Sequence, residues 1–289
     1  MAEGFLDVVG SENESTENRK APLNDHPVFR EISFSNGKIN KMKKDEVKRE
    51  LKERGLDSRG VKEVLRKRLK NHIKKEKLAQ AKLVQEKRTN EVHFYCVIDF
   101  EGTCEENNPN GYIHEIIEFP AVLLDAVTLE KVSEFHEYCK PQDKPELSQF
   151  CQNLTGVTQE TVDNADTFPG VLDNFHQWLN KHELGSEYKF AVVTDGPHDM
   201  KRFFSEQCQL CSILIPKYAR KWINLRKLYR NFYKMKNGTL EDMVNNLGLK
   251  FEGRPHCGID DTRNIARILR KMVQDGCEIK FNESLYDTT

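Results

Sequence analysis

Long hydrophobic runs are absent from this sequence of 289 residues. A membrane-spanning helix needs about 20 consecutive, mainly apolar residues, and no segment approaches that length. The first twenty residues, "MAEGFLDVVGSENESTENRK", are acidic and polar and lack the basic-then-apolar pattern of a secretory signal. We therefore expect an intracellular protein with no membrane partner.

Two other patterns are missing from the sequence. No glycine-rich loop follows a predicted strand, which argues against a dinucleotide-binding enzyme. The segment "CQLC" (208–211) has the spacing of zinc ligands, but no second pair is present to complete a site. The eight cysteines are scattered along a long chain, which favours reduced thiols over a disulfide framework.

Charge is distributed unevenly, although the total is only −1. Residues 38–91 contain 20 Lys+Arg and 9 Asp+Glu, a net charge of +11, so the rest of the chain carries −12. A short basic segment attached to an acidic body is typical of a polyanion-binding module beside a second domain. A solvated helical face is the alternative that charge alone leaves open.

Residue patterns divide the chain into four segments. Residues 1–37 are rich in Ser, Asn and Glu and are predicted to be disordered. Residues 38–75 predict two short helices, the second with Ser58 as its N-cap and an apolar face opposite a basic one. Residues 76–91 predict a charged helical linker. From 92 to 285, strand patterns interleave with helical patterns, which predicts an α/β domain with a mixed sheet.

Two acids close the most apolar predicted strand, "YCVIDFEGTC". Asp99 and Glu101 are two residues apart, so their side chains point to the same face of the strand. Two carboxylates on one face repel each other unless a cation lies between them. Hard divalent ions such as magnesium prefer oxygen ligands, and the pair therefore predicts a metal site.

Further acids and one histidine extend this prediction to a two-ion site. Asp195 ends the strand pattern in "FAVVTDGPHD", with Asp199 four residues later, and "RPHCGIDDTRNIARI" supplies His256 and Asp261 at the opening of a helix. Paired ions stabilise the attacking and leaving oxygens of a phosphoryl displacement, and a neutral imidazole can accept a proton from water. Asp195, Asp261 or His256 alone is more typical of a turn, a cap or a structural contact, and Asp260 is interpreted as an N-cap. Together they predict a nuclease.

These motifs resemble a known enzyme family. Asp99 and Glu101 in "IDFEGT", Asp195 in "VVTDG", and His256 with Asp261 in "HCGIDD" resemble the DEDDh 3′–5′ exonucleases. The segment "NGKINKMKKDEVKRELKERGLDSRGVKEVLRKRLK" looks like a SAP domain. The segments "HEIIEFP", "LTGVTQETVDNADTFP" and "GRPHCGIDD" resemble the Eri-type 3′–5′ exoribonucleases in particular. The resemblance covers about residues 30–285.

The resemblance implies a fold and a reaction. Residues 92–285 would form an RNase-H-like α/β exonuclease domain with a mixed sheet flanked by helices, and residues 38–75 a small helical SAP-like RNA-binding domain. The enzyme would hydrolyse RNA from its 3′ end to 5′-mononucleotides with two magnesium ions, for which manganese can substitute. Glu101 and His256 would be catalytic, with His256 as the general base. The metal ligands would be Asp99, Glu101, Asp195 and Asp261.

Substrates and partners also follow only from the resemblance. The RNA would be a histone-mRNA stem-loop with a short 3′ overhang, a ribosomal RNA 3′ end or a small-RNA duplex. A stem-loop-binding protein or the ribosome would be a partner, and the location cytoplasmic and nuclear, including the nucleolus. The expected nucleotide-binding residues are Glu101, Gly102, Thr103, Leu154, Thr155 and His256. The expected RNA-binding residues are Arg59, Lys62, Arg66, Lys67, Arg68, Lys70, Lys221 and Arg226.

The sequence departs from the family at two places. Gly102 stands where close relatives often have Ala, which we expect to loosen the packing slightly, and Pro197 and His198 replace a pair that includes an aromatic residue. Asp199 matches the family pattern. Both departures leave the local substrate contacts open.

Three alternatives remain open from the sequence. The segment "KYARKWINLRKLYRNFYK" interleaves basic residues with Trp222, Tyr229, Phe232 and Tyr233; these aromatics could stack on single-stranded bases or form the buried face of a helix. A DNA 3′ exonuclease would use the same chemistry, and a contact to the 2′-hydroxyl decides between the substrates. A non-catalytic RNA-binding module is the third alternative, but binding alone would need neither the acids nor His256.

Overall fold

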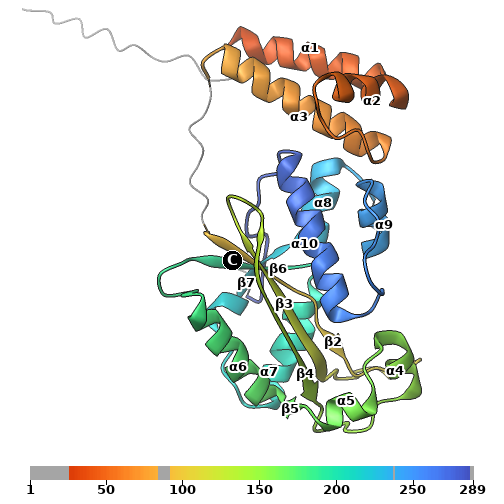
Figure 1. Cartoon of the computed structure of the whole chain (residues 1–289), viewed down its shortest axis with the longest axis vertical. Coiled ribbons are helices and arrows are strands. Elements are labelled where there is room, and N and C mark those ends of the chain that lie inside the picture. The colour runs from red at the N-terminus through yellow and green to blue at the C-terminus, as the bar shows by residue number, and fades with distance from the viewer. Residues whose placement is uncertain (1–25, 84–91, 237, 287–289) are drawn as a thin grey trace, which may run out of the picture.

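The computed structural model describes residues 26–83, 92–236 and 238–286 (Figure 1). These residues form a unit of three helices and a larger α/β unit. No helix within these ranges is both long and apolar enough to cross a bilayer.

The N-terminal unit is built from α1 (Pro27–Lys41), α2 (Lys44–Glu53) and α3 (Lys62–Gln80). Its small core is completely enclosed, and its apolar residues recur three or four positions apart within each helix, as an amphipathic helix requires. The buried residues of this core are Ile39, Val47, Leu51, Leu65 and Leu69.

Three details of this unit differ from the sequence prediction. Disorder was expected through residue 37, but α1 begins at Pro27 because Val28 and Ile32, one helical turn apart, are buried; residues 1–25 lie outside the described part of the chain. The N-cap of α3 is Val61 and not Ser58. The same helix continues to Gln80, into the segment predicted as a linker, of which 84–91 are also outside the description.

The α/β unit is organised around an eight-stranded mixed sheet with the order β5-β4-β3-β1-β6-β7-β8, in which the short β2 pairs with β3. Strand β1 is antiparallel to β3 and parallel to β6, so the predicted mixed sheet is confirmed. The strands are β1 (Phe94–Ile98), β2 (Glu101–Gly102), β3 (Ile116–Asp125), β4 (Lys131–Lys140), β5 (Asp166–Thr167), β6 (Phe190–Thr194), β7 (Lys221–Asn224) and β8 (Glu283–Ser284).

Helices cover both faces of the sheet, with α8–α10 on one side and α6 and α7 on the other (Figure 1). Side chains of β1 alternate between the two cores: Tyr95 and Val97 enter one, and Cys96 and Ile98 the other. Burial on both faces explains why β1 is almost entirely apolar until Asp99. The helices of this unit are α4 (Gln149–Thr155), α5 (Gln159–Asp163), α6 (Phe168–Lys181), the π-helix η2 (Asp199–Phe204), α7 (Ser205–Leu210), the 3-10 helix η3 (Lys217–Ala219), α8 (Leu225–Tyr233), α9 (Leu240–Asn246) and α10 (Gly258–Gln274).

A buried ion pair joins α3 to the α/β unit. Arg68, 5% exposed, donates to both carboxylate oxygens of Asp275 at 2.6 and 3.0 Å, immediately after α10. The Tyr233 hydroxyl donates to the same carboxylate at 2.8 Å, and the Asn71 amide donates to the Asp275 carbonyl at 2.7 Å. Val64 of α3 joins the apolar core beneath α10. The three-helix unit is therefore docked through apolar contacts and one multiply bonded carboxylate.

We expect Asp275→Ala to destabilise the protein strongly. Removing one partner of a buried ion pair leaves the other charge uncompensated, which costs about 3–5 kcal/mol. Denaturant unfolding should show this loss in Asp275→Ala. Lys280→Ala, which removes the exposed pair with Glu278, should change the free energy of unfolding by less than about 1 kcal/mol. Equal effects of the two substitutions would show that the Arg68–Asp275 pair does not hold the units together.

Candidate active site

Three carboxylates from separate elements meet at the end of β1. Asp99 follows β1, Glu101 opens β2, and Asp261 lies in the first turn of α10; one oxygen from each lies within 4.8 Å of the others. The spacing of Asp99 and Glu101 along an extended chain brings two of them together, and packing of α10 on the sheet brings the third. This cluster contains no cationic side chain and fits a hard divalent cation, which prefers oxygen ligands.

A fourth carboxylate, Asp199, lies next to this cluster. It is 6% exposed at the start of η2, and its Oδ1 accepts the backbone N–H of Phe100 at 3.1 Å, between Asp99 and Glu101. Apart from burial, the charge of Asp199 contributes most to the raised pKa of Asp99. The sequence prediction places the ligand role on Asp195 and not on Asp199; no local pattern shows the bond between Asp199 and the Phe100 N–H.

Asp195 lies at the edge of this cluster and has a cationic partner. It follows β6 and forms an ion pair with Arg226 in the first turn of α8; the Arg226 N–H also bonds the Asp195 carbonyl at 2.9 Å. Its second oxygen, Oδ1, is buried without a hydrogen-bond partner. Asp195 is thus half neutralised, unlike Asp99 and Glu101, and Arg226 is committed to it rather than free for RNA.

The predicted general base, His256, lies on the exposed loop before α10. Its backbone N–H donates to Asp261 Oδ2 at 2.9 Å, while Asp261 Oδ1 is buried without a partner. This residue has φ of 62°, in the left-handed region that costs a non-glycine residue about 1–3 kcal/mol. This bond holds the His256 backbone next to Asp261, and the residue itself is exposed to solvent.

Burial and mutual repulsion raise the pKa values of all these carboxyl groups. Burial, followed by the charges of Asp199, Glu101, Asp261 and Asp195, raises the pKa of Asp99 well above its usual range. Burial likewise raises the pKa of Glu101 well above its ordinary value, and raises the pKa of Asp199 and of Asp261 to about 7. A negative cluster of this kind is unfavourable without a cation.

The predicted nucleotide-binding segments also converge. The Cys151 thiol of α4 donates to the Gly102 carbonyl at 3.7 Å, which ties α4 to β2. Arg254, two residues before His256, donates to the Leu154 carbonyl at 3.2 Å. Thr103 and Thr155 are buried, and their hydroxyls already bond backbone groups nearby.

Gly102 is tightly enclosed, contrary to the loosened packing expected from sequence. A Cβ at this position would lie 3.2 Å from Phe203 Cε1 and 3.3 Å from both the Glu115 carbonyl and His114 Cβ. An alanine here would therefore require small shifts of these neighbours. The N-cap of α10 is Cys257 and not Asp260, which was expected from sequence. The Asp260 carboxylate instead accepts the backbone N–H of Arg254 at 3.0 Å.

Several residues predicted to bind RNA have other partners. Arg68 is buried in its pair with Asp275. Arg66 donates to the backbone carbonyls of Asn40 and Met42, because the last carbonyls at the C-terminal end of α1 have no partner within the helix. Both arginines are therefore structural in this arrangement. The remaining predicted RNA-binding residues are more accessible. Arg59 is exposed but bonds Asp57, and Lys70 bonds Asn40. Lys67 lies over the Phe232 ring, whereas Lys62 and Lys221 have solvent-accessible side chains.

The aromatic residues after β6 are mainly core residues. Trp222, Tyr229 and Tyr233 are between 0% and 3% exposed, so they cannot stack on a strand of RNA. Phe232 is partly buried beneath Lys67. The alternative of a buried helical face is the one that the structure supports.

The comparisons with known proteins agree with this geometry. A family model described as Exonuclease matches residues 96–269, and a SAP-domain model matches 38–74. The 3'-5' exoribonuclease 1 of Homo sapiens is 49% identical over 266 residues, covering 90% of this chain and 74% of that protein.

Two solved structures agree with these matches, the first across both units and the second across the nuclease domain alone. One, described as "3'-end specific recognition of histone mRNA stem-loop by 3'-exonuclease", is 47% identical with a TM-score of 0.68 over 91% of each chain. The other, the nuclease domain of 3'hExo, "a DEDDh family member, bound to rAMP", is 50% identical with a TM-score of 0.66, covering 68% of this chain and 100% of that one.

Fold, acidic cluster and family model define an exonuclease domain preceded by a SAP domain. The chain belongs to this exonuclease family, alongside the 3'-5' exoribonuclease 1 proteins. It is an enzyme of the 3′–5′ exoribonuclease type, and its domain implies divalent metal ions.

The raised pKa values predict how the metal-free protein responds to pH. The folded state binds more protons than the unfolded chain between about pH 4 and pH 7, so its free energy of unfolding falls as the pH rises through that range. A bound divalent ion offsets this repulsion. We therefore expect Mg²⁺ to raise the melting temperature more at about pH 8 than at about pH 6.

Thermal melts with chelator and with Mg²⁺ test this expectation. The Asp261→Asn variant is the control, because it removes one carboxylate of the cluster and should flatten the pH dependence of the metal-free form. A metal-induced shift in melting temperature that is the same at both pH values would contradict the electrostatic account.

Proposed function

We propose that this enzyme removes 5′-mononucleotides from the 3′ ends of structured RNA by magnesium-dependent hydrolysis. The observation that carries the proposal is the convergence of Asp99, Glu101 and Asp261. Asp199 accepts the Phe100 N–H between the first two, and the backbone of the exposed His256 bonds Asp261. Manganese, with the same preference for oxygen, is expected to substitute.

The donor set fits divalent cations. Its ligands are oxygens only, the carboxylates repel one another, and Asp261 Oδ1 is a buried acceptor without a donor. We assign the ligands as Asp99, Glu101, Asp199 and Asp261, and place Asp195 outside them because one of its oxygens is paired with Arg226. When bound, the ions would lower the pKa of the attacking water and stabilise the departing 3′ oxygen.

The remaining steps belong to the side chains of the protein. Glu101 and the backbone around Gly102 and Leu154 would hold the terminal nucleotide. His256 would take the proton of the attacking water at a ring nitrogen. The water oxygen would bond to phosphorus as the bond between phosphorus and the 3′ oxygen of the preceding nucleotide breaks. That 3′ oxygen would take a proton from solvent, which leaves the shortened RNA with a 3′-hydroxyl and releases the 5′-mononucleotide.

The SAP unit accounts for the preference for structured RNA. A related protein has been solved in recognition of a histone mRNA stem-loop, and that substrate is the one we favour here. Its phosphates would meet the accessible cations Arg59, Lys62 and Lys70 of the SAP unit and Lys221 beyond it, without sequence readout. Contact to the 2′-hydroxyl would select RNA over DNA.

Other substrates and partners are proposals of lower rank. Ribosomal RNA 3′ ends and small-RNA duplexes share the feature of a 3′ end beside a helix. A stem-loop-binding protein or the ribosome would present such ends, in the cytoplasm or in the nucleus and nucleolus. The chemistry of the site is the same for each of them.

Digestion of a stem-loop RNA with a short 3′ overhang tests the proposed function. We expect Mg²⁺-dependent release of 5′-mononucleotides, slower release from the matched DNA, and none with chelator. Asp199→Asn should lower kcat by at least about 100-fold, since each carboxylate supports transition-state charge. Asp195→Asn should keep much more activity.

Binding measurements separate catalysis from substrate affinity. Asp99→Asn should abolish hydrolysis and still bind the stem-loop with nearly unchanged affinity. Products that are short oligomers or 3′-phosphates would overturn the proposed reaction. A larger loss in Asp195→Asn than in Asp199→Asn would restore the ligand assignment made from sequence.

A further inference from the structure

A buried glutamate outside the acidic cluster of Asp99, Glu101 and Asp261 connects the sheet to the start of α10. Glu118 of β3 is 1% exposed and lies opposite Glu101 in the strand register. Its Oε2 accepts the N–H of Gly258 and its Oε1 the N–H of Ile259, both at 3.0 Å. His136 Nε2 of β4 lies 2.9 Å from Oε1. This carboxylate is thus fully bonded and needs no cation.

Glu118 performs the capping that the helix does not perform for itself. The N-cap residue of α10, Cys257, makes no side-chain capping bond. The first N–H groups of a helix lack partners within the helix and carry the positive end of its dipole. A carboxylate from a neighbouring strand satisfies both requirements and also fixes where the helix begins relative to the sheet.

The close approach of helix and strand leaves no space for a side chain at the first position. A Cβ on Gly258 would lie 3.0 Å from both Glu118 Cδ and the Asp99 carbonyl. The backbone at the start of α10 therefore contacts the strand end that carries the first metal ligand. Any displacement of Gly258 would move Asp261, three residues later, away from Asp99.

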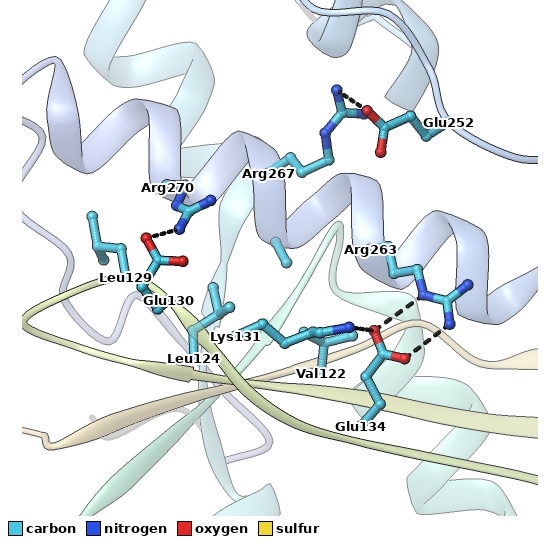
Figure 2. A pocket seen from close by; sticks show the side chains of 11 residues that line it. Val122, Leu124, Leu129, Glu130, Lys131, Glu134, Glu252, Arg263, Arg267 and Arg270 are labelled. Carbon is cyan, nitrogen blue, oxygen red and sulfur yellow. Dashed lines mark hydrogen bonds and ion pairs between the residues drawn. The ribbon is translucent and has the colours of Figure 1, made fainter.

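Other polar ties of α10 to the sheet are at the surface. Figure 2 shows the groove between α10 and the β3–β4 hairpin, where Arg263 pairs with Glu134 and Arg270 with Glu130. These arginines are 46% and 37% exposed, and exposed pairs contribute about 0–1 kcal/mol. Glu118 is the buried polar tie at the catalytic end of the helix.

We propose that Glu118 is a positioning residue that sets Asp261 and His256 against Asp99 and Glu101, so that the divalent-ion site forms only when its carboxylate holds the start of α10. The inference rests on the proposed function for its catalytic consequence, but its structural part concerns metal affinity alone. Glu118 itself neither binds the ions nor touches RNA.

The test compares Glu118→Gln with a matched control, Glu115→Gln, in the full chain. Glu115, three residues before Glu118, is also buried, at 3% exposed. Its carboxylate accepts two backbone N–H groups, those of Gln142 and Lys144. Both variants exchange a carboxylate for an amide that can accept at only one oxygen. They differ in the segment that each carboxylate holds. Glu115 holds the loop at 142–144, whereas Glu118 holds the start of the helix that carries Asp261.

Mn²⁺ affinity, followed by electron paramagnetic resonance, is the first readout. Loss of a group that orients metal ligands typically weakens metal binding or activity by 10–100-fold, and we expect a fall of about this size in Glu118→Gln only. On stem-loop RNA its kcat should fall to a similar extent with KM nearly unchanged. Thermal melting should show comparable destabilisation of both variants.

Each result decides the inference. Wild-type Mn²⁺ affinity and kcat in Glu118→Gln, at a stability equal to that of Glu115→Gln, would reduce Glu118 to a structural cap. If Glu118→Gln does not fold, Gly258→Ala, which pushes the helix from the same carboxylate, must weaken Mn²⁺ binding, and unchanged binding would overturn the inference. Wild-type protein that binds Mn²⁺ but releases no mononucleotide would contradict the proposed function and leave the affinity comparison valid.

Discussion

Mutual repulsion among buried carboxylates is the constraint on which the rest of this structure depends. Asp99, Glu101, Asp199 and Asp261 come from four elements, and burial and neighbouring charge raise the pKa of each. Such a cluster opposes folding unless cations compensate it. The sheet, η2 and α10 hold these groups together despite this cost, which is the expected signature of a metal-dependent catalytic site.

Helix α10 connects the catalytic site to the SAP unit. It begins beside the Asp99 carbonyl, under the carboxylate of Glu118, and it is followed by Asp275, which binds Arg68 of α3. Helix α10 thus contacts the acidic cluster at its first turn and α3 of the SAP unit at its far end. This arrangement fixes the distance between the SAP unit and the acidic cluster.

Local patterns carried most of the prediction from sequence. The mixed sheet and the pair Asp99 and Glu101 follow from strand periodicity and the alternation of side chains. The choice between Asp195 and Asp199 depended on an ion pair to Arg226, 31 residues away, and on the π-helical turn of η2. No local pattern contains such information.

Long-range burial accounts for other residues whose surroundings the sequence does not show. Arg68 has the sequence context of a phosphate-binding residue, but its partner Asp275 lies 207 positions away.

Counting Mn²⁺ ions bound at equilibrium by calorimetry tests the central claim most directly. The account predicts two ions per chain, saturable and lost in Asp99→Asn. Absence of saturable binding by the wild-type protein, or equal binding by that variant, would contradict it.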